Sequence, residues 1–268
     1  MTRWGMPTRA ARPVRARRAT RWALGLPVVL AACAIPSASA HAATFATVTA
    51  TLSPNRLSSS GAVNVTIGFS DPSGSLPAPL RGATVRFPAG LRLDVPHLRS
   101  CSGPRLQALG ANACPGASLL GGGRAVVAEF IGAQLVTENV SLRLFLGPLR
   151  NLQPTVEVFG EGVSPFAEQV VLDGLVFADV APYGERLVLT IPPIATVPQQ
   201  ADASIPAFSL TVGSNGRERR TRATVHVPAN CPAGGFPLVG EFAYDDGSSD
   251  SARARIPCPA SGHGARER

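Results

Sequence analysis

The sequence predicts an all-β protein, a β-sandwich-like module of about a dozen short strands with one short helical excursion closed by a disulfide. Its 27 glycines and 25 prolines interrupt the chain every few residues, which long helices do not tolerate. Between the interruptions lie short runs in which apolar and polar residues alternate, the pattern of half-buried strands. Turn residues separate these runs at the spacing expected of a sandwich.

The predicted strands follow one another along most of the chain. The first two, 44–52 and 62–69, are rich in β-branched residues, and the third, 83–87, stops at Pro88-Ala89-Gly90. We expect Gly121–Gly123 to form the entry to the next strand. Further alternating runs lie at 124–130, 140–146, 155–159, 169–180, 186–191, 208–212 and 221–227.

One segment departs from the strand pattern. Residues 102–110 can form about two helical turns, with Ser102 as the cap, Pro104 in the first turn and Gly110 after the end. Cys101 and Cys114 flank this segment. A disulfide between them would close the excursion.

The last two strands form a predicted hairpin. Its arms, 236–244 and 251–256, alternate, and Asp245-Asp246-Gly247-Ser248 supplies the turn. Cys231 precedes the first arm and Cys258 follows the second, so the two thiols can meet at the open end.

The amino terminus predicts export. A basic segment, the apolar run Trp22–Ile35 and small residues near Ala40 and Ala42 form a signal peptide over residues 1–42. Cleavage near Ala40 or Ala42 is one processing route; lipidation of Cys33, which follows Leu30-Ala31-Ala32, is the alternative. Residues 43–259 are then a single large β-sandwich-like module, and 260–268 a disordered tail.

The basic charge is concentrated in the leader. The chain has a net charge of +8, but seven arginines precede Trp22, and the remaining 18 arginines face 17 acidic residues. A nearly neutral body offers no electrostatic surface for nucleic acid. We therefore expect no nucleic-acid partner and membrane contact only through the signal peptide or a lipid anchor.

Four cysteines remain after the leader, and three pairings are formally possible. Local pairing, Cys101 with Cys114 and Cys231 with Cys258, is the simplest and suits an oxidising compartment. A zinc site formed by His97, Cys101 and Cys114 would lack the Cys-x-x-Cys spacing typical of such sites.

Several motifs in order resemble uncharacterised, secreted, β-rich cell-envelope or extracellular proteins of high-GC, actinobacterial-type bacteria. The motifs are Val85–Leu91, Cys101, Ala113–Ser118 with Gly121, Leu142–Leu146, Ile205–Val212, and the ending from Asn230-Cys231 to Cys258. They consist largely of Pro, Gly, Cys and apolar residues, which are structural types. The resemblance implies an exported β-module and transfers no catalytic residues.

Candidate chemistry is sparse. The chain has no lysine, which excludes Schiff-base and P-loop chemistry. Five acidic residues in the middle strands could pair for glycoside hydrolysis, although alternation places most of them toward solvent: they are Glu157, Glu161, Glu168, Asp173 and Asp179. His97 with Asp94 and a serine is a second hydrolase candidate, whereas alternation makes His226 an ordinary strand residue.

Two charged segments suggest ion binding. Asp245–Asp250 could donate oxygen ligands to calcium, but a hairpin turn needs the same residues and no distal Glu follows. Arg217–Arg222 is a basic cluster at a predicted hairpin tip that could bind an anionic envelope polymer.

These observations predict an exported, extracellular or cell-surface protein without enzymatic activity. We expect it to have a structural or binding role at the cell envelope, toward an envelope or extracellular partner. We expect no catalytic residues, no cofactor and no metal. The alternative is a secreted hydrolase that uses a carboxylate pair or a site based on His97.

Overall fold

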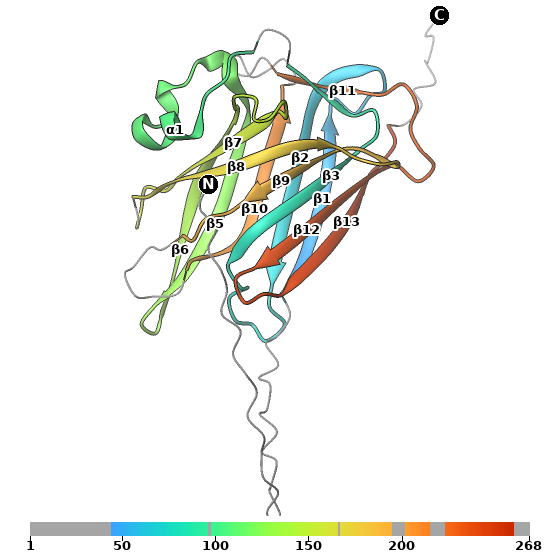
Figure 1. Ribbon diagram of the computed structural model, residues 1–268. Helices are drawn as coiled ribbons and strands as arrows, with labels where there is room; N and C mark the ends of the chain where they lie inside the picture. The colour runs from blue at the N-terminus through green and yellow to red at the C-terminus, as the bar shows by residue number, and fades with distance from the viewer. Residues whose placement is uncertain (1–43, 96–97, 166, 195–201, 215–222, 260–268) are drawn as a thin grey trace, which may run out of the picture. The chain divides into compact units, whose positions relative to one another are not determined.

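The computed structural model describes residues 44–95, 98–165, 167–194, 202–214 and 223–259, and these form one antiparallel sheet of 13 strands (Figure 1). The strand order is β13-β12-β3-β9-β8-β7-β6-β5-β10-β2-β11-β4, and β1 pairs with β2. The sequence-based prediction of a β-rich fold with about a dozen strands is therefore confirmed.

The strands agree with the predicted runs, with one addition. They are β1 (Phe45–Ser53), β2 (Ser59–Ser70), β3 (Leu80–Pro88), β4 (Arg92–Asp94), β5 (Leu119–Ile131), β6 (Gln134–Leu146), β7 (Thr155–Glu161), β8 (Gln169–Ala178), β9 (Tyr183–Thr190), β10 (Ser204–Gly213), β11 (Thr224–Val227), β12 (Phe236–Tyr244) and β13 (Ser249–Ile256). The three-residue β4 was not predicted, because so short a strand shows no alternation; among the described residues it pairs with β11 alone.

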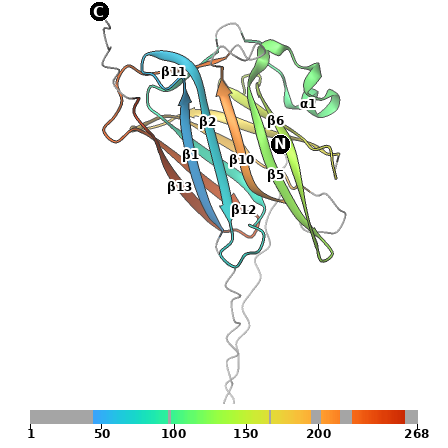
Figure 2. The same cartoon turned by 180° about the vertical axis from the view of Figure 1, so that it is seen from behind.

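The sheet folds over so that its two halves face each other. β13, the first strand in the order, lies beside β1, which is paired with β2 near the other end (Figures 1 and 2). Phe69 of β2 contacts Phe242 of β12 edge to face, with ring centroids 4.8 Å apart, although the two strands are far apart in the strand order. The main hydrophobic core lies between the halves, as a sandwich requires.

Alternation accounts for this core. In β12, Phe236, Leu238 and Phe242 face inward and are buried, while Glu241 and Ala243 are exposed. β13 buries Ala252 and Ile256 in the same way. The period-two pattern therefore accounts for most of the closing hairpin, although Val239 of the outer face is also buried.

The glycine segment lies inside a strand, which corrects its assignment to a strand entry. Gly121 and Gly123 are within β5 and pair with Val212 and Leu210 of β10. A Cβ at Gly123 would lie 1.9 Å from the carbonyl oxygen of Ser209. Only glycine permits so close an approach of the two backbones.

The helical excursion is present on the outside of the sheet. It contains α1 (Gly103–Leu109) and two 3₁₀ turns, η1 (Ala111–Ala113) and η2 (Gly116–Ser118). Leu106 of α1 and Ala111 pack with Phe145 and Phe159 in a second, smaller core. Among the described residues, no helix is both long and apolar enough to cross a membrane.

The structure contains two disulfides, in the local pairing expected from the sequence. Cys101 is joined to Cys114, with Cα atoms 5.5 Å apart, and Cys231 to Cys258, with Cα atoms 5.8 Å apart. Two such bonds indicate an oxidising environment. Cys33 and the predicted signal peptide and tail, 1–42 and 260–268, lie outside the described residues.

Candidate functional site

The five acidic residues proposed for hydrolysis do not converge on one cleft. Glu157 of β7 lies directly across from Asp173 of β8, beneath the helical excursion. Asp179 lies beyond the other end of β8, where it binds Arg86. Glu168 is exposed before β8 begins.

Glu157 is buried, with 2% of its surface exposed, so its predicted solvent-facing position is wrong. The backbone N–H of Gly103, at the start of α1, donates a hydrogen bond to its carboxylate. Ser102, the expected cap, makes no side-chain capping bond. Glu157 therefore stabilises the start of α1 from a neighbouring strand, because a carboxylate satisfies the free amides and the positive end of a helix.

Asp173 is also bound to a protein group. Arg150 holds its two carboxylate oxygens through Nη1 and Nη2, at 2.5 and 2.9 Å. Burial raises the pKa of Glu157, and the negative charge of Asp173 raises it further. The hydrogen bond from Gly103 and the positive charge of Arg150 lower this pKa. Glu157 thus joins the excursion to the sheet, while Asp173 binds the β6–β7 connection through Arg150.

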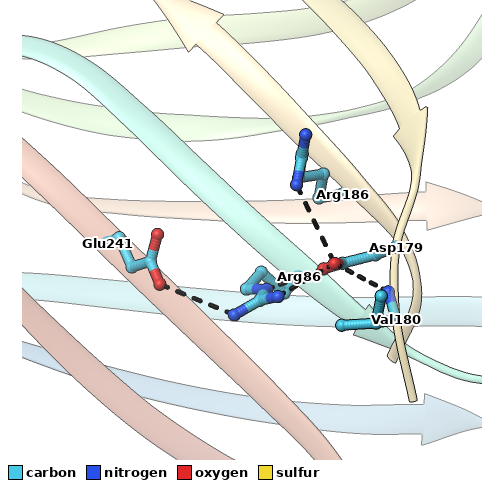
Figure 3. A network of polar contacts seen from close by, with 5 residues as sticks. All are labelled: Arg86, Asp179, Val180, Arg186 and Glu241. Carbon is cyan, nitrogen blue, oxygen red and sulfur yellow. Dashed lines mark hydrogen bonds and ion pairs between the residues drawn. The ribbon is translucent and has the colours of Figure 1, made fainter. Parts of the chain in front are cut away.

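Asp179 lies in a charged network that joins four segments of the chain (Figure 3). Nε and Nη2 of Arg86 contact its two oxygens at 2.6 and 2.8 Å, and the N–H of Val180 donates to it. Nη1 of Arg186 lies 3.9 Å from Asp179, and Nη1 of Arg86 lies 3.9 Å from Glu241.

The network is closed from solvent at its centre. The Asp179 side chain is 2% exposed, which corrects its assignment to a solvent-facing position. The Arg86 guanidinium lies over the ring of Tyr183, 4.8 Å from its centroid, and Arg186 lies over Phe177. A bidentate pair stacked on an aromatic ring is rigid.

Arg86 lowers the pKa of Asp179 to about 2. Because this value is below that of the unfolded chain, the carboxylate stabilises the fold at neutral pH, and the stabilisation is lost as the pH falls from about 4 toward 2. We expect Asp179→Asn to be less stable at pH 7 and to show a smaller loss of stability between pH 4 and 2. Urea unfolding at several pH values measures both.

Asp245→Asn is the matched control, since Asp245 is exposed in the β12–β13 turn. It should retain the acid dependence of the natural protein. An Asp179→Asn variant whose stability falls with acid as steeply as that of the natural protein would contradict the assigned role of this pair.

The network borders an open hollow on the outer face of β9, β3, β12 and β13. Cross-strand pairing places small side chains in one row over these strands: Thr190, Gly82, Ala243 and Ser249. The next row contains Val188, Thr84, Glu241 and Ser251. The hollow over these two rows, Thr190 excepted, has a volume of about 610 Å³, within the usual range for ligand sites.

The third row supplies positive charge at the edge of the hollow. Its members are Arg186, Arg86, Val239 and Arg253. Arg253 is exposed, and the ion pairs found among the described residues do not include it. Three acids, Asp179, Glu241 and Asp250, lie at or beside the hollow and balance the three arginines. Arg253 is therefore the exposed cation that a ligand can reach at this edge.

The other predicted site residues remain apart. His226 is exposed on β11. The carboxylate of Asp246 accepts hydrogen bonds from Ser248 within the hairpin turn, and that of Asp250 accepts one from the N–H of Ala46. His97 and the whole basic cluster 217–222 lie outside the described residues.

The hollow was not predicted from the sequence. Its floor residues are ordinary solvent-facing strand residues, and their meeting depends on which strands are neighbours. The alternation of Gly82 and Thr84, and of Ser249 and Ser251, was the available signal, but it did not identify the strand order.

The chain matches no protein-family model, no curated protein and no solved structure.

Proposed function

We propose that this chain is an exported protein that works without catalysis, as a binding module at the cell envelope, and that the hollow on β9, β3, β12 and β13 is its binding surface. The observation that carries this proposal is the open floor of the hollow, in which small side chains and hydroxyl groups lie beside a rigid charged edge. The disulfides and the resemblance to secreted β-rich proteins support an extracytoplasmic setting.

The floor favours an extended polar ligand. Gly82 and Ala243 leave space, and the hydroxyls of Thr84, Ser249 and Ser251 can donate and accept hydrogen bonds. A floor without large exposed apolar side chains lacks the anchors typical of protein–protein interfaces. Hydroxyl-rich polymers offer many matching hydrogen-bonding groups.

The edge favours acidic groups on that polymer. Arg253 is exposed and the Arg186 side chain is 42% exposed. Each guanidinium can bind a carboxylate or phosphate. We therefore propose an acidic polysaccharide of the cell envelope as the ligand.

The hydrolase alternative has less support. Glycoside hydrolysis needs two carboxyl groups that flank a substrate bond. Glu157 and Asp173 are engaged by Gly103 and Arg150, and Asp179 by Arg86. These acids have structural partners.

Gel electrophoresis of the mature protein through immobilised polygalacturonate tests the proposal, with dextran and polylysine as neutral and cationic comparisons. We expect polygalacturonate alone to retard the protein. Ala243→Trp should weaken retardation at least about tenfold by filling the floor, and Arg253→Ala should weaken it by a smaller factor that shrinks with added salt.

Thr137→Trp is the matched control, because Thr137 is an exposed residue of β6, three strands away from β9 in the sheet. It should bind as the natural protein does. Equal retardation of Ala243→Trp and Thr137→Trp would refute the binding surface, and release of reducing sugar ends would favour the hydrolase.

A further inference from the structure

A cavity of about 70 Å³ lies on the inner face of β5, β6, β7 and β8, with Ile194, and Ile205 of β10, completing its lining. Apolar side chains form most of its wall: Val127, Val140, Val170, Leu172, Ile194 and Ile205. Two carboxylates, those of Glu138 and Glu168, complete the wall. An apolar chamber that ends in acids suits a ligand with one apolar and one positively charged part.

Glu129 is an unusual polar residue beside this chamber, next to its wall and not part of it. It follows Val127 by two residues on β5, in regular pairing with β6, and therefore shares the inward face of the wall residues Ala125 and Val127. Glu129 is buried, with 4% of its surface exposed. Both carboxylate oxygens are buried and have no hydrogen-bond partner among the described residues.

The charges around Glu129 are negative. Burial raises the pKa of Glu129, and the carboxylates of Glu168 and Asp202 raise it further. Asp202 is paired with Arg81, and Glu138 accepts hydrogen bonds from the amides of Val163 and Ser164. Glu129 itself has no such compensation, and an unpaired buried carboxylate is costly.

The spacing of the acids argues against a metal ion. Within the part of the chain that the structure describes, no three acidic, cysteine or histidine side chains are close enough to hold one. An organic cation can use a single carboxylate and place its apolar part in the chamber. Since an apolar cavity of roughly 150 Å³ accommodates benzene, a cavity half that size suits a chain of about three or four carbon atoms.

We propose that this chamber binds the ammonium group of a short primary alkylamine, with Glu129 and Glu168 as its carboxylate partners and the alkyl chain against Val127, Val170 and Leu172. The chain has no lysine of its own. The ammonium group therefore comes from a free amine or from a lysine side chain of another molecule. The proposal does not depend on the polysaccharide site.

Ligand-observed NMR on the mature protein at pH 7 tests the proposal, with n-butylammonium as the probe. We expect saturation transfer to butylammonium and none to n-butanol or butyrate at the same concentration. Adding the tripeptide Ala-Lys-Ala distinguishes the two sources: displacement of butylammonium would indicate a lysine side chain as a ligand, and no displacement a free amine.

Glu129→Gln should lower the butylammonium affinity at least about tenfold, because it removes a charged hydrogen-bond acceptor. Glu161→Gln, on the outer face of β7, is the matched control and should leave the affinity unchanged. Val170→Phe keeps Glu129 but fills the chamber, so it should also abolish binding. This variant tests the proposal if Glu129→Gln does not fold.

Three results would overturn the proposal. They are equal binding of butanol and butylammonium, unchanged affinity in a folded Glu129→Gln variant, and equal displacement of butylammonium by sodium ions.

Discussion

Replacement of Gly123 by alanine is expected to destabilise the fold by about 3 kcal/mol or more, or to prevent folding. The added Cβ would lie 1.9 Å from the carbonyl oxygen of Ser209 and 2.9 Å from its carbonyl carbon. These are backbone atoms of β10, which is paired on its other side with β2. To remove this clash, β5 and β10 would have to move apart and lose hydrogen bonds between them.

Gly116→Ala is the matched control for this prediction, since a Cβ at Gly116 meets no atom within 4 Å. Its stability should be within about 0.5 kcal/mol of the natural protein. Urea unfolding of both variants, followed by circular dichroism, gives the comparison. A Gly123→Ala variant as stable as Gly116→Ala would show that β5 and β10 do not approach each other this closely.

Phe69→Ala is expected to destabilise the protein by about 3–5 kcal/mol. Phe69 is buried and contacts Phe242 and Tyr244 of β12 in edge-to-face geometry, with centroid distances of 4.8 and 6.2 Å. It also lies 6.2 Å from Phe208 of β10. The substitution therefore removes a contact that joins the two halves of the folded sheet and leaves a large cavity.

Phe130→Ala removes the same side chain at a site where the residue is 47% exposed, near the tip of the β5–β6 hairpin. Its effect on the free energy of unfolding should be small. Thermal unfolding of the two variants measures the difference. If both substitutions lower stability equally, the core does not lie between the two halves as described.

Local patterns predicted most of the elements. The alternation in 236–244 and 251–256 identified β12, β13 and their turn, because one face of each arm is buried and the other is not. Gly110 correctly marked the end of α1, where it has a φ of 72°. Such features depend on a few neighbouring residues, so they are visible in a single sequence.

Contacts between distant strands could not be predicted in the same way. Glu157 occupies a position that alternation assigns to solvent, and it is buried because α1 covers that part of the outer face. Asp179 is buried because Arg86, 93 residues earlier, reaches it. Each depends on the order of strands in the sheet, which alternation does not determine.

The candidate sites could not be predicted either, because they too depend on the order of the strands. Ser249, Ala243, Gly82 and Thr190 form one row only because β13, β12, β3 and β9 are neighbours in the sheet. Glu129 is an unremarkable acidic residue in the sequence, and its burial without a partner emerges only in the folded chain.

Hydrogen–deuterium exchange of the mature protein with and without oligogalacturonate tests the central claim most directly, because it locates the binding surface without a substitution. The proposal predicts slower exchange in β3, β12 and β13, around Thr84, Ala243 and Ser251, and unchanged exchange in β5 and β6. Protection confined to other strands, or no protection at saturating oligosaccharide, would contradict it.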